Sequence, residues 1–226
     1  MSLIYLHHFP YEERRIPMLS LQTVLPNTLE LMRTLMFQPE LEQTRLVGGT
    51  ALALQYGHRQ SVDLDFFGHV TEDTDELTLS LSETFSNITK RNCTKHIKGY
   101  MLNGIKVDIV NYDYPWIDAP VVEEGLRLAS PKDIAAMKVN AVIGRGTKKD
   151  FIDVYFLLRH YSFEELISFY MKKYAEASEY RALLSMTYFE DAESDPMPYM
   201  YEDVSWDSMK NRIRKEVENY MRRHSK

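Results

Sequence analysis

Two aspartates separated by one residue, Asp63 and Asp65, are the side chains in this sequence with the clearest capacity for chemistry. Residues 62–66 alternate apolar and acidic side chains, which predicts a strand with both carboxylates on one face. Neighbouring carboxylates repel each other and raise each other's pKa, a cost that a bound divalent cation removes. Hard oxygen ligands of this kind suit Mg²⁺, so the pair predicts a magnesium site.

A glycine turn precedes these acids by about fifteen residues. Gly48 and Gly49 follow a short predicted strand that starts at Thr44, and residues 50–56 favour a helix that Gly57 ends. Backbone N–H groups in such a turn approach an anion closely, and the helix dipole favours a phosphate there. A phosphate site beside a two-carboxylate metal site is the arrangement used for phosphoryl or nucleotidyl transfer.

These residues carry a family resemblance. The run Gly48-Gly49-Thr50, followed by Arg59-Gln-Ser61-Val-Asp-Leu-Asp65, resembles the signature of nucleotidyltransferase-fold proteins, and more narrowly the AbiEii/AbiGii group of type IV toxin–antitoxin and abortive-infection toxins. The general pattern has Gly-Ser before Asp-x-Asp, and Thr50 keeps the hydroxyl. The competing interpretation is a plain glycine turn followed by a solvent-facing acidic strand.

A β-hairpin is predicted over residues 97–110, because Asn103-Gly104 separates two apolar-rich runs. A two-residue turn pairs Leu102 with Ile105, which places Asp108 opposite Gly99 and leaves space beside the Asp108 carboxylate. The resembled family carries its third metal-side acid on such a strand, so the resemblance implies that role for Asp108. The alternative is an ordinary solvent-facing acid.

A helix is predicted from residue 131 to 143, with Ser130 as its cap and Gly144 at its end. Lys138 lies inside the apolar stripe of this helix, where an ammonium group needs an anionic partner or a pocket. Its stem could also lie along the core with the head in water. Lys138-Val-Asn-Ala141 matches a Lys-x-x-Ala helix of the family, which implies contact with nucleotide phosphates.

A short basic glycine loop, residues 144–149, comes next. Asp150 at the cap and Asp153 at the third position of a helix over residues 151–160 explain both acids structurally. The family carries a basic residue and then Lys-Asp-x-x-Asp, matched here by Arg145 and by Lys149 to Asp153. The resemblance implies that Arg145, Lys149 and Asp150 lie at the nucleotide and that Asp153 is a general base or a structural anchor. Whether Asp150 and Asp153 cap the helix or serve the site stays open at this point.

Composition limits the class of protein. The chain has 226 residues, 44% of them apolar, one cysteine (Cys93) and a formal net charge of −6, so local patches would have to hold any RNA. No apolar run approaches the ~20 residues of a membrane span, and the N-terminus lacks a signal-peptide layout. We expect a soluble, cytoplasmic protein without a membrane partner.

The remaining pattern suggests two parts. Residues 1–122 would form an α/β (α+β) nucleotidyltransferase core with a short mixed sheet flanked by helices. That part would include a surface arm over residues 1–17, a helix over 25–43 that Asn27 caps and that Pro39 kinks or divides, and a helix over 71–85. Residues 112–122 read as a connection, and residues 123–226 as a helical domain that closes the cleft. An acidic stretch, residues 190–207, precedes a basic final helix that Ser205 caps.

The expected function is transfer of a nucleoside monophosphate from an NTP to an acceptor hydroxyl on RNA, such as tRNA, or on a protein. Asp63, Asp65 and Asp108 would hold one or two Mg²⁺, and Asp108 or Asp153 would take the acceptor proton. The phosphates would bind Gly48, Gly49, Thr50 and Lys138, with help from Arg59 or Ser61. The resemblance implies a toxin with a cognate antitoxin; the alternative is a catalytically inactive nucleotide-binding or protein-interaction module.

Overall fold

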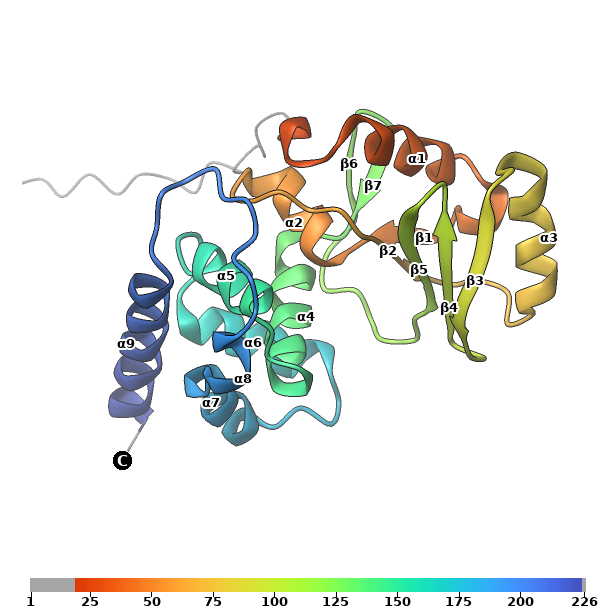
Figure 1. Ribbon diagram of the computed structural model, residues 1–226. Helices are drawn as coiled ribbons and strands as arrows, with labels where there is room; N and C mark the ends of the chain where they lie inside the picture. The colour runs from red at the N-terminus through yellow and green to blue at the C-terminus, as the bar shows by residue number, and fades with distance from the viewer. Residues whose placement is uncertain (1–18, 225–226) are drawn as a thin grey trace, which may run out of the picture.

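A mixed sheet of seven strands, in the order β3-β4-β5-β2-β1-β7-β6, forms the framework of the N-terminal half (Figure 1). The computed structural model describes residues 19–224, so the arm expected over residues 1–17 lies outside the described residues. The strands are β1 (Thr44–Leu46), β2 (Leu64–Gly68), β3 (Ile88–Cys93), β4 (Ile97–Leu102), β5 (Ile105–Asn111), β6 (Val121–Glu123) and β7 (Leu126–Leu128). The predicted α/β class with a mixed sheet is confirmed.

The hairpin of β4 and β5 has the predicted register. Leu102 pairs with Ile105 and Gly99 with Asp108, and the turn residues Asn103 and Gly104 have positive φ angles of 50° and 80°. The space beside Asp108 is narrower than expected, because a Cβ at Gly99 would lie 3.2 Å from the Asp108 Oδ1. The Asp108 carboxylate therefore occupies the space next to Gly99 that a side chain at this position would need.

Four strands differ from the sequence prediction. The acidic strand β2 begins at Leu64 rather than at Val62, so Asp63 lies in the loop before it. The polar strand β3 pairs with β4 at the sheet edge, and β6 and β7 form a hairpin whose β7 lies parallel to β1. This second hairpin includes residue 122, at which the sequence analysis placed the boundary between the core and the helical domain. That boundary stays a prediction.

The helices that flank the sheet follow their local signals. They are α1 (Pro26–Met36), α2 (Gly48–Tyr56) and α3 (Thr74–Thr84), with short 3-10 turns η1 (Leu21–Thr23) and η2 (Pro39–Leu41). Gly57 ends α2 in a left-handed conformation, φ +68°, as expected. The cap predicted at Asn27 is wrong, because α1 begins at Pro26 and Leu25 occupies the cap position.

The C-terminal half is a packed group of helices (Figure 1). It contains α4 (Pro131–Gly144), α5 (Lys148–Leu157), α6 (Phe163–Lys173), α7 (Glu179–Thr187), α8 (Glu190–Glu193) and α9 (Trp206–His224). Ser130 caps α4 and Ser162 forms a capping box on α6, both by accepting backbone N–H bonds. Among the described residues, no helix has the length and apolar character needed to cross a bilayer.

A C-terminal segment returns to the N-terminal half. Between α8 and α9 the chain runs back toward α2, and Met200 forms an antiparallel bridge with Arg59 (Figure 1). The Gln60 amide donates to the Tyr199 carbonyl at 2.9 Å, and the Tyr201 amide donates to the His58 carbonyl at 3.0 Å. Residues 199–201, the bridging segment, therefore tie the helical half to the loop that carries Arg59 and leads to Asp63.

Candidate functional site

The sheet places two of the three predicted metal-side acids side by side. Asp65 on β2 and Asp108 on β5 are direct partners in the parallel register. Lys106 pairs with the Asp108 carboxylate at 2.7 Å. Burial, and next the Asp108 carboxylate, raise the pKa of Asp65 to about 6. A cation bound between the two carboxylates would remove this repulsion, so the donor set fits a hard divalent ion.

Asp63 is held differently, through its backbone. The Thr50 hydroxyl donates to the Asp63 carbonyl and lies 2.8 Å from the Ser61 hydroxyl. Both hydroxyls are buried, so in this structure they fix the loop that carries Asp63. Across residues 19–224 no group of three acidic, histidine or cysteine side chains is gathered as a ready metal site. Metal binding by Asp63, Asp65 and Asp108 together stays a prediction.

The glycine turn lies directly against the site side chains. Gly48 has a φ of +69°, and a Cβ there would lie 2.6 Å from Asp65 Oδ2. A Cβ at Gly49 would lie 2.1 Å from the Arg59 Nη2. Gly48 is needed for its positive φ and lets the backbone approach the Asp65 carboxylate. Gly49 lets the Arg59 guanidinium lie on the start of α2, and a larger residue there would displace Arg59.

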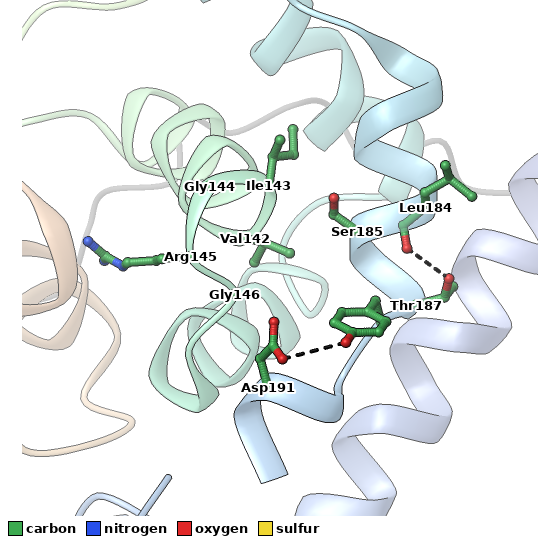
Figure 2. Close-up of a pocket in the computed structure, with 10 residues that line it drawn as sticks. Val142, Ile143, Gly144, Arg145, Gly146, Leu184, Ser185, Thr187 and Asp191 are labelled. Atoms are coloured by element: carbon green, nitrogen blue, oxygen red, sulfur yellow. Dashed lines mark hydrogen bonds between the residues drawn. The ribbon is translucent and has the colours of Figure 1, made fainter. Parts of the chain in front are cut away.

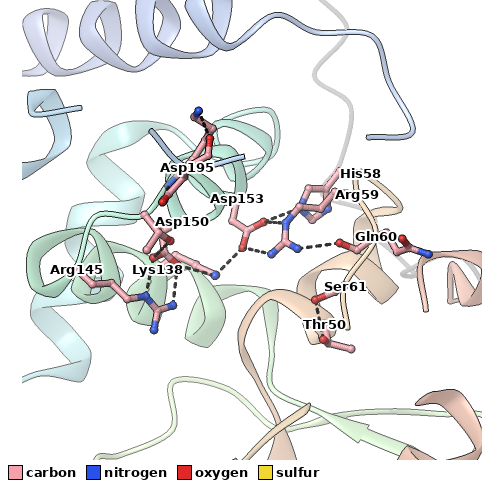
Figure 3. A network of polar contacts seen from close by, with 12 residues as sticks. Thr50, His58, Arg59, Gln60, Ser61, Lys138, Arg145, Asp150, Asp153 and Asp195 are labelled. Atoms are coloured by element: carbon pink, nitrogen blue, oxygen red, sulfur yellow. Dashed lines mark hydrogen bonds and ion pairs between the residues drawn. The ribbon is translucent and has the colours of Figure 1, made fainter. Parts of the chain in front are cut away.

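Asp153 is the centre of a buried network of charges (Figure 3). Its carboxylate accepts bonds from His58 Nε2 at 2.7 Å and from Arg59 Nε and Nη2 at 2.8 and 2.9 Å. The Lys138 Nζ lies 2.6 Å from the Asp153 Oδ2. Burial opposes its ionisation, but Arg59 and Lys138 hold the pKa of Asp153 well below the usual range. The Lys138 side chain has only 5% exposure, so the alternative of a water-exposed ammonium head is wrong.

Asp150 forms the second half of this network. It accepts from Lys138 Nζ at 3.0 Å, from Arg145 Nε at 2.8 Å and from the Thr147 hydroxyl at 2.7 Å. The cap role predicted for Asp150 is wrong, because α5 begins at Lys148 and Thr147 occupies the cap position. Asp153 accordingly lies inside the helix rather than in its first turn. Burial opposes ionisation of Asp150, while Lys138 and Arg145 lower its pKa.

His58 belongs to this network and was not predicted from the sequence. Its side chain is fully buried against the Phe156 ring at 4.8 Å, and burial lowers its pKa despite the bond to Asp153. A neutral imidazole then donates from Nε2 to Asp153. A single histidine after Gly57 has no periodic pattern around it, so no local signal marks its role. The charged side chains of the network are three cations and two carboxylates, so its net charge is positive, which suits binding of a polyphosphate. They are Arg59, Lys138, Arg145, Asp150 and Asp153.

Arg145 and Lys149 lie at the exposed side of the network. The Arg145 side chain is 63% exposed although its guanidinium bonds Asp150, and Lys149 is exposed. The bond to Asp150, and more weakly the Asp65 charge, raise the pKa of Arg145, so its guanidinium lies within electrostatic reach of Asp65. A cavity of about 510 Å³ lies between the end of α4, α7 and α8, and Arg145 is one of the residues that line it. Figure 2 shows the Arg145 side chain pointing away from α7 and α8.

Comparisons with known proteins show the family and the fold of this chain. Residues 30–223 match the family described as the nucleotidyl transferase AbiEii toxin of type IV toxin–antitoxin systems. The chain belongs to the AbiEii nucleotidyltransferase toxin family. It is 34% identical over 183 residues to aq_aa25 of Aquifex aeolicus, itself uncharacterised, covering 78% of this chain and 87% of that protein.

Two solved structures share the fold. A Helicobacter pylori protein with a provisional nucleotidyltransferase assignment superposes with a TM-score of 0.59 at 20% identity, over 88% of this chain and 96% of that one. JHP933 from Helicobacter pylori superposes with a TM-score of 0.56, also at 20% identity, over 89% and 96% of the two chains. The family resemblance seen in the glycine turn and the Asp-x-Asp run is confirmed.

Proposed function

We propose that this protein transfers a nucleoside monophosphate from an NTP to an acceptor hydroxyl, on RNA such as tRNA or on a protein, as the toxin of a toxin–antitoxin system. One observation carries the proposal. Asp65 and Asp108 lie in register on neighbouring parallel strands, and the backbone of Gly48 packs against the Asp65 carboxylate. A metal-binding pair of acids thereby adjoins the amino end of α2, where a phosphate is favoured.

Asp63, Asp65 and Asp108 would hold Mg²⁺, which when bound polarises the α-phosphate of the NTP. The N–H groups at the start of α2 bind the β- and γ-phosphates. Positive charge is added by Arg59, which lies against Gly49, and by Lys138, which pairs with Asp153 together with Arg59. The acceptor oxygen bonds to the α-phosphorus while the bond to the bridging oxygen of the β-phosphate breaks. Pyrophosphate leaves, and Asp108 takes the acceptor proton.

We assign Asp153 a positioning role instead of proton transfer. Its carboxylate is fully buried and bonded to His58, Arg59 and Lys138, and a carboxylate with a pKa well below the usual range is a weak base. Asp153 holds both cations in place, and Asp150 does the same for Lys138 and Arg145. Asp108, with a 24% exposed side chain, has the access that proton transfer needs.

Label transfer tests this proposal. The protein is incubated with Mg²⁺ and each α-labelled NTP, with and without total RNA. Label should move onto RNA or protein with the wild-type chain and stay in the NTP with Asp63→Asn. Transfer would identify the base and the acceptor class together. Unchanged activity in Asp63→Asn would rule out the metal role, and no transfer or NTP binding at all would favour the interaction-module alternative.

The acidic stretch, residues 190–207, gives little support to the alternative that this protein is an interaction module. Several of its acids form contacts within the helical half, which leaves fewer of them for a partner protein. The contacts join Glu193 to Lys210, Asp195 to the Lys148 backbone amide, and Glu202 to Arg159. A direct antitoxin complex is tested by gel filtration with the product of an adjacent gene, where co-elution would support it.

A further inference from the structure

Aromatic rings continue the sheet face that carries Asp65 and Asp108. Phe67 follows Asp65 by two residues on β2, so both side chains point to the same face. Tyr112 follows Asp108 by four residues, and its amide extends the pairing by donating to the Gly68 carbonyl at 2.9 Å. The Phe67 and Tyr112 ring centroids are 5.1 Å apart, and Tyr114 lies 5.2 Å from Tyr112. The acids therefore adjoin an aromatic surface.

The helix α4 contacts both the aromatic segment and the charged network. At its first turn, Asp133 accepts the Ile117 amide at 2.8 Å, which anchors the segment that carries the aromatic rings. Five residues later Lys138 contacts Asp150 and Asp153. A nucleotide whose α-phosphate lies at Asp65 and Asp108 would thus have the aromatic surface beside it on the same sheet face.

Tyr114 is the ring with an accessible face. It is 48% exposed, and it meets the Tyr174 ring edge-on at 4.8 Å and 69°. The neighbouring rings are occupied: the Tyr112 hydroxyl bonds Tyr174 at 3.0 Å, and the Arg45 guanidinium covers Trp116 at 4.2 Å. An exposed ring held by packed rings is a rigid surface for stacking of a base.

We propose that Tyr114, supported by Phe67 and Tyr112, stacks on the base of the bound NTP. The inference rests on the proposed nucleotidyltransferase function and adds the base subsite to it. Stacking accepts any base, so Tyr114 would set affinity for nucleosides over bare polyphosphate and contribute less to the choice among bases.

Binding of NTP and of inorganic tripolyphosphate, each measured by calorimetry with Mg²⁺, separates the subsites. Tyr114→Ala should bind every NTP about tenfold more weakly and tripolyphosphate equally well, because only the NTP carries a base. Tyr114→Phe keeps the ring and should match the wild type. Equal weakening of both ligands, or unchanged NTP binding in Tyr114→Ala, would overturn the base subsite.

A second measurement uses Trp116, which lies 5.4 Å from Tyr112. In a Trp206→Phe background, NTP should change the Trp116 fluorescence and tripolyphosphate should not; the same response to both would count against the proposal. If the wild type binds tripolyphosphate and NTP while Tyr114→Ala is unaffected, only the base subsite fails. If the wild type binds neither ligand, the proposed function fails with it.

Discussion

Asp65 is a residue at which stability and function are opposed. Burial and the Asp108 carboxylate raise its pKa from 3.8 to about 6, so the folded protein binds more protons than the unfolded chain between these values. The metal-free protein therefore loses stability as the pH rises through about 4 to 6. Asp65→Asn removes this cost and should raise the free energy of unfolding by about 1–2 kcal/mol at neutral pH, discounted for solvent screening.

Urea unfolding in chelator checks this prediction. The stabilisation by Asp65→Asn should shrink at acid pH, where Asp65 is protonated in wild type as well. Added Mg²⁺ should stabilise the wild type and leave the variant unchanged. A variant less stable than wild type at neutral pH without metal would show that Asp65 has a structural role instead.

Asp153 is predicted to behave in the opposite way. Its carboxylate compensates Arg59 and Lys138 in a fully buried position, and Asp153→Asn would leave their charges partly unpaired. We expect a loss of about 3 kcal/mol in the free energy of unfolding, from urea titration at neutral pH. Asp118→Asn, which removes an exposed pair with Lys132, is the matched control and should cost less than about 1 kcal/mol. Similar costs for both variants would contradict the central role of Asp153.

The sequence indicated which acids belong to the candidate site better than it indicated which residues contact them. The alternation around Asp65 and the turn before Asp108 are local signals, and Asp65 and Asp108 are direct register partners on neighbouring strands. The face predicted to be shared by Asp63 and Asp65 on one strand is wrong, because β2 begins at Leu64 and Asp63 lies in the loop before it. The bonds from His58 and Lys138 to Asp153 join residues far apart in the chain. Local pattern indicates that a buried lysine needs a partner but cannot indicate which acid it meets.

At the scale of the element, the turn from β1 into α2 is the most constrained. Gly49→Ala would place a Cβ within 2.1 Å of the Arg59 guanidinium, so Arg59 must move away from α2 and from Asp153. We expect label transfer to fall at least about tenfold, since displaced positioning residues are costly to catalysis. Gly144→Ala is the control, because a Cβ there meets nothing within 4 Å. Normal transfer by Gly49→Ala would show that Arg59 placement is not needed.

Helices and strands were predicted correctly where a local turn or cap determines them without tertiary contacts. Asn103-Gly104 specifies a two-residue turn, and that turn sets the whole register of β4 and β5. The polar edge strand β3 and the three-residue strands β6 and β7 have little apolar alternation, so nothing local distinguishes them from loops. The start of α5 was misplaced because Asp150 accepts from Thr147 and from distant cations instead of capping a helix.

At the scale of the molecule, the network is complete only when the two halves meet. Arg59 and His58 come from the N-terminal half, whereas Lys138 and Asp153 come from α4 and α5. The bridging segment reinforces this contact from the far end of the chain, and the Tyr201 hydroxyl donates to the Gln22 carbonyl beside it. The sequence suggested a helical part that closes on the core, but no local pattern located these contacts.

Removing one amide donor from the bridging segment tests whether the helical half positions the site. Tyr201→Pro eliminates the bond to the His58 carbonyl, whereas Tyr201→Phe loses only the hydroxyl bond to Gln22. We expect the Gln60 amide to exchange faster with solvent in Tyr201→Pro, and label transfer to fall severalfold, because Arg59 loses part of its support. Tyr201→Phe should stay near wild type in both measurements. Faster exchange of Gln60 with unchanged transfer would mean that the Asp153 network holds Arg59 without this segment, and the segment would then contribute to stability alone.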